Sequence, residues 1–154
     1  EVVSNVWGGS DFAYLQSVQT SGEEDYSGYE SEVELSENEL IEKLKSKHND
    51  VNINFSEENS VQIIEYTESG RVKTIKFGNI QIAGTEARTL LGLKSTNFSF
   101  EINDGKIKFK VLGYGHGVGM SQTGADSMAK AGSNYEEIIK HFYSGVEIKN
   151  VNEI

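Results

Sequence analysis

Apolar and polar residues alternate along several short segments, and this period of two is typical of strands with one buried face. The pattern predicts strands at "AYLQSV" (13–18) and "YESEVELS" (29–36), joined by the loop "QTSGEEDYSG". It also predicts a hairpin in "VQIIEYTESGRVKTIKFGN", with the turn at residues 68–70. These segments indicate a fold that contains several short strands.

A second hairpin is predicted in "FSFEINDGKIKFKVLG", where Asp104–Gly105 supplies the preferred two-residue turn. Apolar side chains share one face of each of its strands. They are Phe98, Phe100 and Ile102 in the first strand, and Ile107, Phe109 and Val111 in the second. The second strand leads directly into a stretch rich in glycine.

The segment after Ser36 has the pattern of an amphipathic helix. Ser36 and Glu39 have the spacing of a capping box at its start. Leu40, Ile41 and Leu44 form an apolar stripe, which we expect to be buried.

Further short helices are predicted at 85–93 and in the C-terminal part of the chain. There the helix in "MSQTGADSMAKAG" is expected to end at Gly132. The helix in "SNYEEIIKHFYSG" is expected to start with a capping box of Ser133 and Glu136 and to end at Gly145. Strands and helices follow no regular βαβ order. We therefore expect an α+β fold of mixed or antiparallel strands and hairpins with several short helices.

Length and composition fit a globular protein. The chain has 154 residues, 36% of them hydrophobic, which predicts one domain with one sizeable core. The absence of cysteine excludes disulfides, thiolate metal sites and a cysteine nucleophile. No apolar run reaches the ~18 residues that cross a bilayer. Because the chain begins abruptly at Glu1, we expect a processed or truncated piece of a longer protein.

The net charge of −10 is unevenly distributed. Residues 1–70 carry a net charge of −13, whereas residues 71–154 carry +3. This balance argues against a protein that binds nucleic acid or anionic membranes, because such proteins need a strongly basic face. The acidic half is interpreted as a solvated surface, with cation binding as the alternative.

Glycine occupies every second position in "GYGHGVGMSQTGA", around a single histidine, His116. The four glycines are Gly113, Gly115, Gly117 and Gly119. If the stretch is extended, they leave one face bare for another backbone or a flat sugar ring. If they take positive φ, they form a tight cradle before a helix, whose N–H groups could hold an oxygen. Close packing inside the fold is the third alternative.

Other known motifs match this stretch poorly. Its spacing is not that of the dinucleotide fingerprint, and no lysine follows to form a phosphate loop. Ser121, Asp126 and His141 have the chain order of a serine hydrolase triad, although Thr123 stands where the nucleophile elbow has a glycine. The three histidines are far apart and no H-E-x-x-H is present, so we expect no metal site.

The segment "GYGHGVGMSQTGADSMAKAGSNYEEIIKHFYSGVEI" resembles the signature end of the stage II sporulation protein D (SpoIID/LytB) family, which includes amidase enhancers. The similarity extends back through "TEARTLLGLKSTNFSF", "SGRVKTIKFGN" and "LSENELIEKL" to "VWGGSDFAYLQSV", and so covers nearly the whole chain. The resemblance implies that residues 1–154 are the C-terminal portion of a domain of this family.

The resemblance implies a peptidoglycan lytic transglycosylase that cleaves stem-free glycan strands to 1,6-anhydro products during engulfment in sporulation. One carboxyl group would protonate the glycosidic oxygen and then take the proton of the sugar 6-hydroxyl. The parent protein is expected to be membrane-anchored and extracytoplasmic, to face the cell wall, to work with other engulfment proteins and to need no cofactor.

This chain departs from the family in three ways. In the family the catalytic Glu lies before the "VWGG" region, and no Glu of this chain matches it. A membrane anchor and the Cys and His zinc ligands of some relatives also lie upstream and have no counterpart here. We therefore expect the intact parent to be the enzyme and this chain to supply the wall of the substrate cleft. The alternative is a non-catalytic glycan-binding or amidase-enhancer module.

The resemblance assigns substrate contacts to the matched motif, whose polar side chains can hydrogen-bond sugar hydroxyls or N-acetyl groups while the glycines allow close approach. The expected contact residues are Gly115, His116, Gly117, Ser121 and Gln122. Tyr29 is added from a family segment rich in aromatic and basic residues, from which "GYESE" departs. Tyr114 could stack on a sugar or belong to the core. No catalytic or metal-binding residue is expected.

Overall fold

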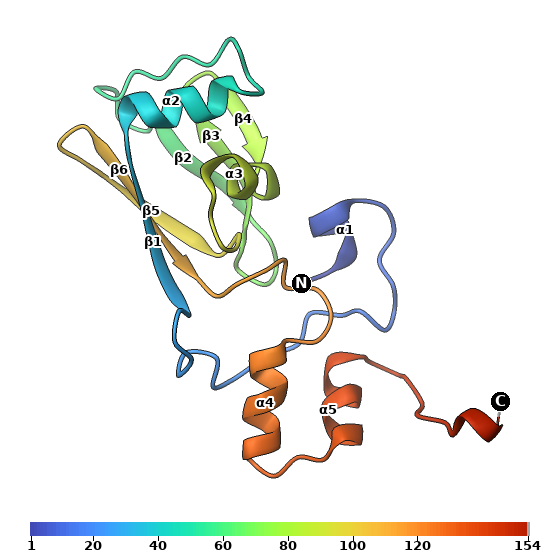
Figure 1. Ribbon diagram of the computed structural model, residues 1–154. Coiled ribbons are helices and arrows are strands. Elements are labelled where there is room, and N and C mark those ends of the chain that lie inside the picture. The colour runs from blue at the N-terminus through green and yellow to red at the C-terminus, as the bar shows by residue number, and fades with distance from the viewer. Residues whose placement is uncertain (154) are drawn as a thin grey trace. The chain divides into compact units, whose positions relative to one another are not determined.

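The computed structural model describes residues 1–153, which fold into two compact units (Figure 1). Unit 1 combines two segments, Glu1–Ser27 and His116–Ile154, and unit 2 is the continuous segment Gly28–Gly115. The units contain two antiparallel sheets and short helices, which confirms the predicted α+β class. No helix in the described part of the chain is long and apolar enough to span a bilayer.

The first sheet of unit 2 has the strand order β1-β6-β5, and both pairings are antiparallel. Its strands are β1 (Glu30–Ser36), β5 (Phe98–Asn103) and β6 (Lys106–Leu112). The predicted turn between β5 and β6 is confirmed, with Asp104 at φ 49° and Gly105 at φ 72°. Two consecutive positive φ values are what the Asp-Gly pair favours in a two-residue hairpin.

The second sheet of unit 2 has the strand order β2-β3-β4 and is also antiparallel. Its strands are β2 (Val61–Tyr66), β3 (Val72–Phe77) and β4 (Ile80–Ala83). The hairpin of β2 and β3 turns at residues 68–70 as predicted. The sequence did not indicate β4, because four residues are too short to show a periodic pattern.

Two helices cover the sheets of unit 2, namely α2 (Glu37–Lys45) and α3 (Gly84–Leu91). The Ser36–Glu39 capping box is present, and Leu40 and Leu44 are fully buried as predicted. The main hydrophobic cluster of the described residues lies wholly within unit 2, so the expected core belongs to this unit. Its largest fully buried side chains include Phe77, Phe109, Leu40, Leu44 and Ile75.

Gly84 begins α3 where this helix contacts β3. A Cβ atom at this position would overlap the carbonyl oxygen of Val72 and lie 2.8 Å from its carbonyl carbon. The helix therefore approaches the backbone of β3 more closely than any residue with a side chain would allow.

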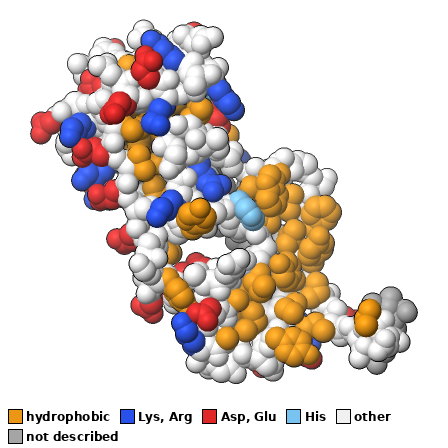
Figure 2. Space-filling view, in the orientation of Figure 1, with side chains coloured by type: hydrophobic (Ala, Val, Ile, Leu, Met, Phe, Trp, Pro, Cys, Tyr) orange, Lys and Arg blue, Asp and Glu red, His pale blue; other side chains and the backbone are white. Residues whose placement is uncertain are grey.

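Glutamates and lysines face each other across the solvated side of the first sheet, and Figure 2 shows the two charges interspersed over unit 2. Lys106 pairs with Glu34 and Lys110 with Glu101, at 2.7 and 2.8 Å. The hydrogen bond from each lysine, followed by its charge, holds the pKa of Glu34 and of Glu101 below the ordinary 4.5. Opposite charges at cross-strand positions also favour this register over a shifted one.

These pairs predict a loss of stability in acid. A carboxyl group whose pKa is lower in the folded state stabilises the fold above its unfolded pKa, and this contribution disappears as the pH falls through the folded pKa. We therefore expect the urea midpoint of the wild type to fall below about pH 4.5. The double variant Glu34→Gln/Glu101→Gln should lose less stability between pH 7 and pH 3. An identical loss in both proteins would contradict this assignment.

Unit 1 is helical within the described residues. Its elements are α1 (Val3–Trp7), α4 (Gln122–Lys130), α5 (Tyr135–Phe142) and the 3-10 helix η1 (Val151–Glu153). The strand predicted at 13–18 is wrong: this segment forms a turn, in which the Leu15 N–H donates to the Phe12 carbonyl at 3.0 Å, followed by irregular backbone. Alternation alone does not make a strand where the fold provides no partner strand.

Two predicted boundaries of α5 are also wrong. The capping box is formed by Asn134 and Glu137, one residue later than the predicted pair. The helix ends at Phe142 because Tyr143 takes an extended conformation (φ −123°, ψ 99°), so Gly145 is not the residue that stops it. The helix α4 ends at Lys130, and Gly132 follows with φ 101°.

Candidate functional site

The four alternating glycines all adopt left-handed backbone conformations. The φ angles of Gly113, Gly115, Gly117 and Gly119 are 71°, 86°, 79° and 79°. This observation favours the cradle over the flat, bare-faced strand. A Cβ atom at Gly115 would meet nothing within 4 Å, and one at Gly119 would lie 3.6 Å from the Tyr143 hydroxyl. Glycine is therefore required here by the conformation and not by close packing.

The stretch is divided between the two units, since Gly113–Gly115 belong to unit 2 and His116 onward to unit 1. In unit 2, the Gly113 N–H donates to the Tyr29 carbonyl at 2.6 Å, and the Gly115 N–H donates to the Lys94 carbonyl at 2.9 Å. Tyr29 is half-buried. Tyr114 is 79% exposed, which excludes the core position considered for it.

A groove of about 440 Å³ in unit 2 lies at the start of β1 and β5 and the end of β6, with Tyr66 at its side. None of the six predicted contact residues lines this groove. Two of them, Tyr29 and Gly115, belong to unit 2, and the other four belong to unit 1.

In unit 1, the His116 side chain is exposed, and its ring contacts a backbone N–H and an indole. The backbone N–H of Val118 donates to its Nδ1 at 3.0 Å. Because Nδ1 accepts this hydrogen bond, the neutral ring carries its proton on Nε2. The ring centroid of Trp7 lies 4.8 Å from that of His116, with 54° between the ring planes. The imidazole is thus fixed with an N–H donor beside an indole.

Ser121 is the N-cap of α4 and also holds a carboxylate. Its Oγ accepts the Gly124 N–H at 3.1 Å and donates to Glu23. Thr20 and Thr123 donate to the same carboxylate at 3.0 and 3.4 Å. The predicted sugar contact of the Ser121 hydroxyl therefore competes with two intramolecular bonds, whereas Gln122 is exposed.

Replacing Ser121 with alanine is expected to destabilise unit 1 by about 1 kcal/mol, because α4 loses its cap and Glu23 loses a donor. The only tryptophan of the chain, Trp7, lies in this unit, so its fluorescence during urea unfolding reports the change. Ser10→Ala, at an exposed position, is the matched control. Equal midpoints for the two variants would refute the capping role.

The three members of the possible hydrolase triad do not form one in unit 1. Ser121 is bound to Glu23, and His141 Nε2 donates to the Gln19 carbonyl at 2.9 Å. Asp126 accepts from Lys130 at 2.8 Å and from the Tyr26 hydroxyl, and these two hydrogen bonds hold its pKa below the ordinary 3.8. Each residue thus has a structural partner outside the proposed triad.

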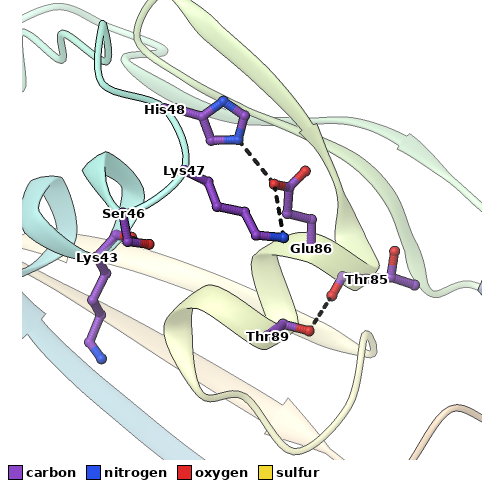
Figure 3. Close-up of polar contacts among 7 residues, drawn as sticks. All are labelled: Lys43, Ser46, Lys47, His48, Thr85, Glu86 and Thr89. Carbon is purple, nitrogen blue, oxygen red and sulfur yellow. Dashed lines mark hydrogen bonds and ion pairs between the residues drawn. The ribbon is translucent and has the colours of Figure 1, made fainter.

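The remaining histidine, His48, pairs with a carboxylate in unit 2. Figure 3 shows its Nε2 and the Lys47 ammonium directed at the same Glu86 oxygen, at 3.1 and 3.9 Å. This contact joins the loop after α2 to α3. Among the side chains that the structure describes, residues 1–152, no three of His, Cys, Asp or Glu are close enough together to hold a metal ion.

Comparison with known proteins gives two kinds of match. A family model described as a domain of unknown function, DUF8618, matches residues 14–119. Stage II sporulation protein D of Bacillus amyloliquefaciens is 40% identical over 91 residues, which are 59% of this chain and 26% of the relative. The amidase enhancer of Bacillus subtilis is 35% identical over 85 residues, 53% of this chain and 12% of the relative.

An uncharacterized protein of Brachyspira hyodysenteriae is 36% identical over 123 residues, 78% of this chain and 32% of the relative. The chain thus spans about a third or less of each of these relatives. The matches confirm the resemblance to stage II sporulation protein D and the amidase enhancer, over 53–59% of this chain and not over nearly all of it.

Proposed function

We propose that this chain contacts peptidoglycan glycan strands. The chain belongs to the DUF8618 family, and it is related to stage II sporulation protein D and to an amidase enhancer. In the longer parent protein, this contact would hold stem-free strands for lytic cleavage to 1,6-anhydro products. The parent would act outside the cytoplasm from a membrane anchor, together with other engulfment proteins.

The observation that carries the proposal is the fixed, exposed imidazole of His116 within the left-handed glycine stretch. Its Nε2–H can donate to a sugar hydroxyl or an N-acetyl oxygen, and the exposed amide of Gln122 can donate and accept. Gly117 is exposed, and its carbonyl accepts a hydrogen bond from the Glu1 ammonium at 3.0 Å. The imidazole and the amide are hydrogen-bonding side chains of the kind that recognise a carbohydrate.

The proton chemistry is assigned to a carboxyl group outside this chain. The carboxylate nearest to the motif residue Ser121 is Glu23, and it accepts hydrogen bonds from three hydroxyl groups of unit 1. These bonds give Glu23 a structural role at the start of α4. The chain would therefore bind and orient the glycan, and the parent would supply the acid.

Digestion of stem-free glycan strands tests this division of labour. The longer protein should release 1,6-anhydro ends, detected by mass spectrometry, and the 154-residue chain alone should bind the strands without cleaving them. His116→Ala should weaken binding about tenfold, the size of one lost hydrogen bond. His116→Gln should recover part of it. Anhydro ends released by the isolated chain would place the acid within it.

The match to the amidase enhancer supports a second function, in which the chain assists another wall enzyme. The two can be told apart with the longer protein. Stimulation of a purified cell-wall amidase without any anhydro product would favour the enhancer. Anhydro product without stimulation would favour the transglycosylase.

A further inference from the structure

Trp7 is the only tryptophan of the chain and is 62% exposed. Figure 2 shows that hydrophobic side chains gather on the surface of unit 1, and the exposed aromatic residues there also include Phe12, Tyr14 and Tyr135. An indole with this exposure gains little from burial in the fold itself. Because it lies next to His116, the exposed indole is in a position to contact a ligand.

The loop after Trp7 is tied back to α1 and has open space at its two glycines. The α1 helix ends at Trp7, and Gly8 and Gly9 follow with φ 73° and 84°. A Cβ atom at either glycine would meet nothing within 4 Å. The N–H and Oγ of Ser4 both donate to the Asp11 carboxylate, at 2.8 and 3.0 Å, and so tie the helix to the far end of the loop.

An aromatic face beside an N–H donor matches the two surfaces of a pyranose ring, whose C–H groups form an apolar face and whose hydroxyls lie at its edge. We propose that Trp7 and His116 form a subsite on which one sugar ring of the strand stacks. The indole covers the apolar face of the ring, and the His116 Nε2–H donates to a hydroxyl or N-acetyl oxygen at its edge. This inference rests on the proposed glycan contact.

The net charge of unit 1 favours a neutral sugar in the subsite. Its two segments carry ten acidic and three basic side chains, a net charge of −7. A stem-free muramic acid ring carries a lactyl carboxylate, which this surface disfavours, whereas N-acetylglucosamine is neutral. The subsite therefore takes the N-acetylglucosamine ring of the alternating strand. A neutral oligomer of N-acetylglucosamine is a sufficient probe.

Titration of the full 154-residue chain with chitohexaose tests the subsite. Because the chain has one tryptophan, a saturable change in its emission reports occupancy next to Trp7 directly. By calorimetry, Trp7→Ala should bind at least tenfold more weakly, and Trp7→Phe should retain part of the affinity. Tyr135→Ala, which removes an equally exposed ring on α5, should bind within twofold of wild type.

The outcomes separate this inference from the proposed function. If the wild type binds chitohexaose but Trp7→Ala binds equally well, the subsite is wrong and the glycan contact stands. If the wild type binds neither chitohexaose nor stem-free strands, both fail. If Trp7→Ala instead abolishes self-association of the wild type in sedimentation, the aromatic surface is a protein interface and the subsite is refuted.

Discussion

Gly84→Ala is expected to destabilise unit 2 by about 3 kcal/mol, the upper part of the range for an overpacked site. Alanine in place of glycine normally stabilises a helix. Here the new methyl group would overlap the carbonyl oxygen of Val72, which is backbone of β3 and cannot rotate away. The helix α3 would have to move off the sheet that it covers. Urea unfolding followed by far-UV circular dichroism measures the loss.

The matched control is Gly92→Ala, at the C-cap of α3. Gly92 has φ 73°, and a Cβ atom there would meet nothing within 4 Å. Its replacement should cost only about 1 kcal/mol, the strain of a left-handed alanine. A Gly84 variant no less stable than this control would show that α3 can shift without loss.

The double variant Gly117→Ala/Gly119→Ala is expected to lose glycan binding by more than tenfold. Both residues have φ 79°, and a left-handed alanine costs roughly 1–2 kcal/mol at each position. The stretch would relax to another conformation, and the Val118 N–H that fixes His116 would move with it. Retention on stem-free glycan strands, compared with the wild type, measures the effect.

Gly132→Ala separates the effect of the motif from that of backbone strain in general. Gly132 also has positive φ, at 101°, and open space around it, but it follows α4 outside the glycine stretch. This variant should lose stability and keep glycan binding. If the Gly132 variant and the Gly117/Gly119 double variant lose glycan binding equally, the loss comes from backbone strain in unit 1 and not from the glycine stretch itself.

Local signals in the sequence predicted most of unit 2. The Asp104–Gly105 turn, the Ser36–Glu39 capping box and the alternation in β5 and β6 are each determined by neighbours along the chain. The start of α5 was wrong by one residue because "SNYEE" contains two overlapping capping-box patterns. Local sequence does not distinguish them, and tertiary packing of the helix decides.

The candidate site was predicted only in part. The glycine–histidine motif indicated His116, Ser121 and Gln122 but not their partners. Glu23 reaches Ser121 across a sequence separation of 98 residues, and Trp7 contacts His116 from the other segment of unit 1. No pattern within one segment encodes such contacts. The α1 helix that carries Trp7 has five residues, too few for a helical period to show.

Unit 2 is an insertion between the two segments of unit 1, and this order has a consequence for folding. Unit 2 is one continuous segment whose two ends are joined by the Gly113–Tyr29 hydrogen bond, so all of its strand pairings can form within that segment. Unit 1 forms only when residues 1–27 meet residues from 116 onward, and a folded unit 2 lowers the entropy cost of bringing these two segments together.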